Sequence, residues 1–208
     1  MSPQTATASR PQQGLTVDEK LRKLKELYAD APDIGRAALK NGLPMIMEEL
    51  SAAGRAQTAG RIGARQGKVS ELTVFLPFVK GGAKRLRGLL QLLEGNFRAA
   101  DAVGTVHDMR FVFVDNDTKL LFATAYDGDF DPYIEDFAAK IPNAMDLWLC
   151  NFEGFPGMRN AAAAAEWIAK HQVAAEAWYV NSPNLTAAET RRLEKVGTAV
   201  EQLLDKIG

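Results

Sequence analysis

The sequence contains few of the residues from which disulfides and metal centres are built. Its 208 residues include one cysteine, Cys150, and two histidines, His107 and His171. A single cysteine forms no internal disulfide, which is typical of proteins in the reducing cytoplasm. Two histidines are too few for a three-histidine metal site. We therefore expect a cytoplasmic protein without a metal centre of that type.

Long apolar runs and an excess of one charge are also missing. No apolar run approaches the roughly 20 residues that a membrane-spanning helix needs, and residues 1–14 lack the apolar stretch of a secretory signal. The 25 basic and 26 acidic residues give a formal net charge of −1, which provides no long-range attraction for nucleic acid. We expect neither a membrane nor a nucleic acid as a partner.

The motifs of two large enzyme classes are absent as well. The stretch 81–84, GGAK, does not have the spacing of a phosphate-binding loop, and no glycine-rich dinucleotide fingerprint follows a strand. The sequence contains no G-x-S-x-G elbow. These absences disfavour nucleotide-dependent and serine-hydrolase chemistry.

The N-terminal third is predicted to be a tail followed by helices and a linker. Residues 1–14 are expected to form a flexible tail, and residues 15–68 a helical extension that ends in a basic linker. A capping box formed by Thr16 and Glu19 opens the first helix. The predicted helices cover 17–29, 34–40 and 44–53. The stretch 51–68 has four positive charges and no acid, but it lacks the aromatic residues of an RNA-binding strip, so we interpret it as a linker.

Residues 69–208 are predicted to form an α+β domain. The expected elements are strands over 71–79, 106–114, 119–126 and 174–180, and helices over 83–100, 132–140, 161–170 and 189–206. The central elements follow the order βαββαβ, which is that of a ferredoxin-like core with an antiparallel sheet. Helices would cover one face of the sheet. The other face also carries large apolar residues and needs a cover.

A second capping box, formed by Thr186 and Glu189, is predicted to open the last helix. This C-terminal helix has an apolar seam. Its apolar residues are spaced three and four apart, which is a short heptad pattern. They are Leu193, Val196, Val200, Leu203 and Ile207. The seam predicts either association into a homo-oligomer or docking onto the chain's own domain.

The order of elements over residues 70–180 resembles the dimeric α/β-barrel superfamily. This superfamily includes antibiotic-biosynthesis-type monooxygenases, chlorite dismutases and dye-decolourising peroxidases. The stretches 105–114, TVHDMRFVFV, and 126–137, YDGDFDPYIEDF, are similar to a bacterial family of this fold to which no catalytic residues are assigned. The resemblance implies a homodimer with a pocket for a small hydrophobic molecule, and oxidoreductase chemistry if the protein is an enzyme.

Four polar residues are candidates for the chemistry of such a pocket: His107, Arg110, Tyr126 and Asp127. In a regular strand His107 shares a face with Met109 and Phe111 and lies opposite Arg110. A histidine there acts as a general base or binds haem, or it is a hydrogen-bonded core residue. The haem-binding relatives imply His107 or His171 as an axial ligand, although His171 also suits the end of a helix.

Two further features have competing interpretations. The alternating carboxylates of Asp127, Asp129 and Asp131 suggest a hard cation, but Pro132 and Ala138 stand where an EF-hand needs Gly and Glu. We therefore favour acids that cap the following helix, with Asp131 as the N-cap.

Cys150 has apolar neighbours and no adjacent base, so we expect a buried, inert thiol.

The sequence leaves two functions open. The first is a small-molecule-binding dimeric α/β barrel, with monooxygenase-like or haem-peroxidase-like activity if it is an enzyme. The second is a non-catalytic assembly protein that uses its N-terminal helices and its heptad-spaced C-terminal helix.

Overall fold

The computed structural model describes residues 15–52 and 57–207. The tail expected at 1–14 lies outside the described residues. The chain divides into two compact units, Met1–Arg55 and Ala56–Gly208, which are described separately.

The first unit is made of three helices, α1 (Val17–Leu27), α2 (Asp33–Asn41) and α3 (Leu43–Ala52). The capping box is formed as predicted, because the Thr16 hydroxyl accepts from the Glu19 amide and the Glu19 carboxylate accepts from the Thr16 amide. Within the described residues of this unit, no side chain whose burial is assigned is fully buried. The three helices therefore share a shallow core.

The second unit is built on a five-stranded antiparallel sheet in the order β1-β2-β3-β5-β4. The strands are β1 (Gln57–Thr58), β2 (Ala64–Gln66), β3 (Val69–Pro77), β4 (Val106–Val114) and β5 (Lys119–Asp127). The predicted hairpin is confirmed, with Val114 paired to Lys119 across the turn. Its residues Asp115, Asn116 and Asp117 all have positive φ, which short polar side chains tolerate best.

The sheet differs from the prediction at its other edge. Part of the segment interpreted as a linker forms β1 and β2, and the strand predicted at 174–180 is not formed. Gln172, just before the predicted strand, makes an isolated bridge to Val74. In that register residue 176 would face Ser70, but Ser70 is already paired with Arg65 of β2. The β1–β2 hairpin thus blocks the edge that the predicted strand needed.

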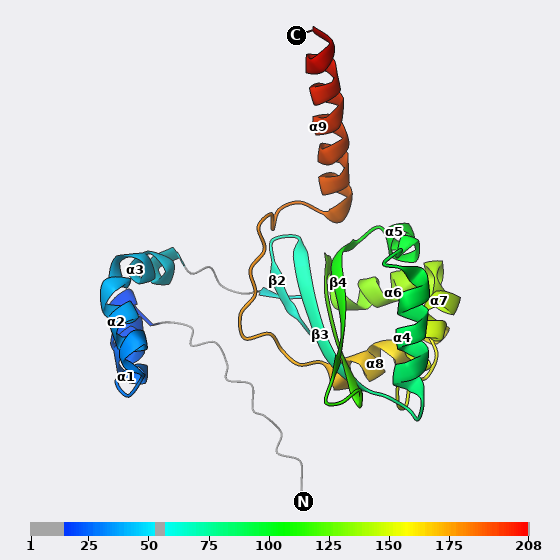
Figure 1. Cartoon of the computed structure of the whole chain (residues 1–208), viewed down its shortest axis with the longest axis horizontal. Helices are drawn as coiled ribbons and strands as arrows, with labels where there is room; N and C mark the ends of the chain where they lie inside the picture. Colours follow the sequence, from blue (N-terminus) through cyan, green and yellow to red (C-terminus); the bar gives the residue numbers. More distant parts are fainter. Residues whose placement is uncertain (1–14, 53–56, 208) are drawn as a thin grey trace, which may run out of the picture. The chain divides into compact units, whose positions relative to one another are not determined.

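Helices cover one face of this sheet (Figure 1). They are α4 (Gly82–Leu93), α5 (Arg98–Val103), α6 (Phe130–Lys140), α7 (Pro142–Leu149) and α8 (Ala161–His171). The single helix predicted over 83–100 is broken, because Glu94 and Gly95 adopt left-handed backbone conformations. The core between sheet and helices is apolar, and Leu72, Leu86 and Phe130 are almost completely buried.

The chain ends in α9 (Ala187–Ile207), which points away from the sheet in Figure 1. Among the described residues, no helix combines the length and the apolar character needed to cross a bilayer.

Candidate functional site

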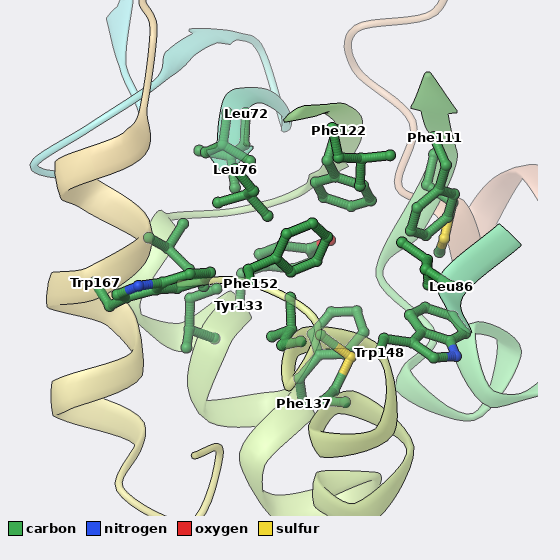
Figure 2. Close-up of a pocket in the computed structure, with 17 residues that line it drawn as sticks. Leu72, Leu76, Leu86, Phe111, Phe122, Tyr133, Phe137, Trp148, Phe152 and Trp167 are labelled. Carbon is green, nitrogen blue, oxygen red and sulfur yellow. The ribbon is translucent and has the colours of Figure 1, made fainter. Parts of the chain in front are cut away.

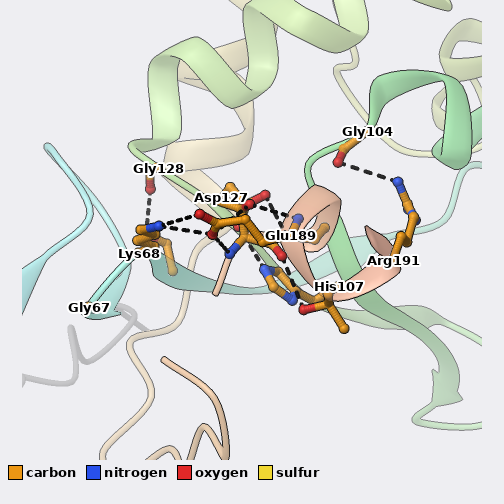
Figure 3. Close-up of polar contacts among 12 residues, drawn as sticks. Gly67, Lys68, Gly104, His107, Asp127, Gly128, Glu189 and Arg191 are labelled. Carbon is orange, nitrogen blue, oxygen red and sulfur yellow. Dashed lines mark hydrogen bonds and ion pairs between the residues drawn. The ribbon is translucent and has the colours of Figure 1, made fainter. Parts of the chain in front are cut away.

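Two of the four candidate residues meet where the sheet contacts α9. His107 at the start of β4 donates from Nε2 to Asp127 Oδ1 at the end of β5, over 2.7 Å. Both side chains are mostly buried, with exposed fractions of 21% for His107 and 13% for Asp127. Figure 3 shows the pair beside the first turn of α9. The pair is therefore part of the junction between two elements.

A β-bulge explains why His107 faces Asp127. Val106 pairs with Tyr126 and Asp108 pairs with the next residue, Ala125, which leaves His107 as an extra residue in β4. The expectation that His107 lies on the face of Met109 and Phe111 is therefore wrong. The bulge also turns Val106 into the core.

The other carboxylate oxygen of Asp127 binds the N-terminus of α9. Oδ2 accepts from the Ala187 amide over 3.0 Å. A negative charge is favourable there because the first amides of a helix are unpaired and carry partial positive charge. Asp127 thus joins His107 of the sheet to the first turn of α9.

A second ion pair holds the same turn. Lys68 donates to both carboxylate oxygens of Glu189 over 2.8 Å, and Glu189 forms the predicted capping box with Thr186. These hydrogen bonds, that of Lys68 foremost, lower the pKa of Glu189 to about 2. Glu189 consequently keeps its charge over the physiological range. We define the α9 anchor as Lys68, His107, Asp127, Glu189 and Arg191.

Arg191 completes the anchor one turn further along. It donates to the Gly104 carbonyl over 3.5 Å (Figure 3). It also lies 3.4 Å from the Asp101 carboxylate. Beyond Arg191, all described residues of α9 are exposed. The helix is held at its first two turns and is free of the sheet unit after them.

The other candidate residues do not join this group. Arg110 lies on the outer sheet face with its side chain 67% exposed, and its nearest carboxylate is that of Asp108 at 3.7 Å. Tyr126 is fully buried, and its ring stacks on Tyr133 with centroids 3.9 Å apart. Burial raises the pKa of Tyr126 well above that of a free tyrosine. Its hydroxyl therefore stays protonated and is not a base.

His171 ends α8, as the helix-end interpretation requires. Its Nδ1 donates to the Trp167 carbonyl over 2.8 Å, and its ring contacts the ring of Trp167. No contact joins His171 to His107 among the described residues.

The basic segment and the acidic loop neutralise each other. Arg61 bonds to Asp131 at 2.9 Å and to Glu166 at 2.7 Å, and Arg65 bonds to Asp129 at 2.7 Å. The expectation of Asp131 as an N-cap is wrong, because α6 begins at Phe130. No group of three or more metal-ligating side chains converges within the described residues. Arg61 and Arg65 are therefore engaged with carboxylates of the same unit.

An apolar cavity of about 50 Å³ lies between the sheet and the helices (Figure 2). Leu72, Phe111, Phe122, Trp148 and Trp167 are among its lining residues, which are all apolar apart from Tyr133. Neither histidine lines it. A cavity of this size holds a few atoms and not a porphyrin. The residues present therefore do not fit a haem.

Cys150 corrects a further expectation, because it is exposed. Its thiol donates to the Leu147 carbonyl over 3.4 Å.

Comparisons with family models, with curated proteins and with solved structures found no match for the chain.

The sequence identifies His107 and Asp127 as candidate site residues. It does not indicate that Lys68, Glu189 and Arg191 belong to the same group. Lys68 was assigned to the linker, and Arg191 has no distinguishing signal in the sequence. Glu189 was found as part of a capping box, but its ion pair with Lys68 joins residues 121 positions apart. Only the folded chain brings these residues together.

We expect Asp127→Ala to loosen the first turn of α9 while the sheet stays folded. The substitution removes two hydrogen bonds to a charged group, each of which contributes about 1.5–3 kcal/mol. Amide hydrogen exchange at Ala187 should become at least about tenfold faster. Asp108→Ala is the matched control, since its exposed carboxylate should contribute less than about 0.5 kcal/mol. Equal exchange in both variants would show that Asp127 does not anchor α9.

Proposed function

We propose that this protein is an assembly module whose interaction surface is the apolar seam of α9. The observation that carries the proposal is the exposure of the seam. Between half and three quarters of each seam residue is accessible: Leu193 53%, Val196 51%, Val200 49%, Leu203 58% and Ile207 72%. Contiguous apolar surface on a soluble domain marks an interaction site.

The way the helix is held supports the same interpretation. Ala187 is the one residue of α9 that is buried within the described part of the chain, and the anchor fixes the helix only near that end. Most helical stability in proteins comes from packing of an apolar face, and the seam of α9 is exposed. The alternative that the seam docks onto its own sheet unit has no contact in its favour.

The N-terminal helices offer further apolar surface for assembly. Leu27 of α1 is 74% exposed and Ile34 of α2 is 81% exposed. A unit of this size with a shallow core gains stability from association.

Replacing the centre of the seam should dissociate the assembly. In the triple variant Val196→Gln, Val200→Gln and Leu203→Gln, the helix keeps residues with adequate helix propensity and gains no charge. Each apolar side chain removed from an interface costs about 1.5–3 kcal/mol, so self-association should weaken by about 100-fold or more. Sedimentation equilibrium of the full chain measures this change.

The matched control places the same residue type on the outer face of α9. Lys195→Gln, Thr198→Gln and Glu201→Gln alter exposed positions and leave the net charge unchanged. This variant should associate like the parent protein. A parent protein that stays monomeric at every concentration would contradict the proposal.

We also propose that the sheet unit has a ferredoxin-like core. Strands β3, β4 and β5 stand in the spatial order β3-β5-β4, as the first three strands of a ferredoxin-like sheet do, and the bridge at Gln172 lies where the fourth strand would pair with β3. This arrangement supports a ferredoxin-like core related to the dimeric α/β-barrel superfamily. In such a dimer the outer sheet face, where Val112 is 47% exposed, would be covered by the second copy.

A second candidate function is the binding of a small hydrophobic molecule in the apolar cavity. The cavity supports it because dry apolar cavities take up apolar ligands. We assign no catalytic step, since His107, Arg110, Tyr126 and Asp127 do not line the cavity. Oxidoreductase activity therefore has no residue in its favour at this cavity.

Xenon, a single apolar atom, is a suitable probe for the second candidate. Added xenon should shift the methyl NMR signals of Val74, Leu76 and Ile134, which line the cavity. The signals of Val69 and Val103, which are buried elsewhere, should not move. If no signal shifts, or if the cavity-lining and control residues shift equally, the proposed binding of a small hydrophobic molecule is contradicted.

A further inference from the structure

We infer that the partner of α9 is the α9 of a second copy of this chain, and that the two helices pair in parallel as a two-stranded coiled coil. This inference rests on the proposed function and adds the identity, number and direction of the helices. It is carried by three features of α9: the residue types along the seam, the positive charge on one flank of the seam, and the anchored end.

The seam residues suit a parallel pair. With Leu193 as position a, positions a and d are occupied by Leu193, Val196, Val200, Leu203 and Ile207. Two of the three a residues, Val200 and Ile207, are β-branched, and the two d residues are Val196 and Leu203. β-Branched residues at a with Leu at d favour two parallel strands. No polar residue interrupts the seam over its 15 residues, which span about 22 Å.

The two flanks of the seam differ in charge. In the same heptad register, Arg192, Ala199 and Lys206 occupy position g on one side of the seam, and Gly197 and Leu204 occupy position e on the other. These residues are all exposed. One flank is therefore basic at its two ends, and the other carries no charge.

The basic flank distinguishes the two directions of pairing. A parallel pair places position g of one copy beside position e of the other, so Ala199 contacts Leu204 of the partner subunit and neither basic residue meets a like charge. An antiparallel pair places each flank beside its own kind, so Arg192 would lie near Lys206 of the partner subunit. Like charges at such positions disfavour a pairing.

The anchor determines what this pairing brings together. Because Lys68, Asp127 and Glu189 hold the first turn of α9, a parallel pair places both sheet units at the same end of the coiled coil. The parallel pair therefore juxtaposes two sheet units, whereas an antiparallel pair would separate them by the length of the helix.

Disulfide trapping tests the inference in the full chain. All variants carry Cys150→Ser, since the natural thiol is exposed. Val200→Cys reports whether α9 meets α9 at all. Leu193→Cys reports direction, because two copies of residue 193 are adjacent in a parallel pair and about 21 Å apart in an antiparallel pair centred on Val200. Thr198→Cys, on the outer face, is the matched control.

We expect both Val200→Cys and Leu193→Cys to form disulfide-linked dimers, each at least about tenfold faster than Thr198→Cys, since pairing raises the effective thiol concentration. Circular dichroism establishes that each variant is folded, and light scattering establishes two chains per assembly.

The outcomes separate the inference from the proposed function. If Val200→Cys links while Leu193→Cys links only when mixed with an Ile207→Cys chain, the helices are antiparallel and the inference is overturned. An assembly of more than two chains overturns it as well. If none of the seam variants links faster than Thr198→Cys and the parent chain is monomeric, the proposed function itself fails.

Discussion

The two oxygens of the Asp127 carboxylate provide the contact on which the account of this molecule depends. One oxygen accepts from His107 over 2.7 Å and the other from the Ala187 amide over 3.0 Å, so the side chain ties the end of the sheet to the start of α9. A carboxylate at a helix N-terminus is favoured by the dipole of the helix. Because the anchor acts at one end only, the sheet unit directs the helix and leaves its apolar seam accessible. The proposed interaction surface is a consequence of that one-sided attachment.

Ion pairs within the sheet unit join the basic stretch to the acidic loop. The basic stretch and the acidic loop, viewed separately, suggest an RNA-binding strip and a cation site. In the folded chain Arg61 and Arg65 of the first hairpin bond to Asp131 and Asp129, and the Arg61 guanidinium also lies 5.3 Å from the Phe130 ring centroid. These pairs are partly exposed, so each adds little stability. Their main effect is to dock the hairpin at the sheet edge, where β2 takes the place that the strand predicted at 174–180 would need.

The sequence allows the local structure to be predicted well and the site only in part. Periodicity and capping signals identified the helices of the first unit, the β4–β5 hairpin, and the seam of α9, because these features depend on neighbours within a few residues. The bulge at His107 arises because β4 has one residue more than β5 where the two strands pair. The periodicity of β4 alone does not predict it. The missing strand at 174–180 has a similar origin, since competition for a sheet edge is decided by tertiary contacts. The helix break at Glu94 has a local signal instead, because Gly95 suits the left-handed conformation that ends a helix. The candidate site was placed in a pocket by resemblance of fold, whereas the one close contact among its residues belongs to the α9 anchor.

Hydrogen exchange along α9 at several protein concentrations tests the central claim most directly. The account predicts two classes of amide. Those at the start of the helix, near Ala187 and Glu189, should be protected at every concentration, because the anchor is intramolecular. Those from Leu193 to Ile207 should exchange rapidly at high dilution and gain protection as the concentration rises, because their stability comes from a second copy. Protection of the seam amides that does not change with concentration would contradict the account.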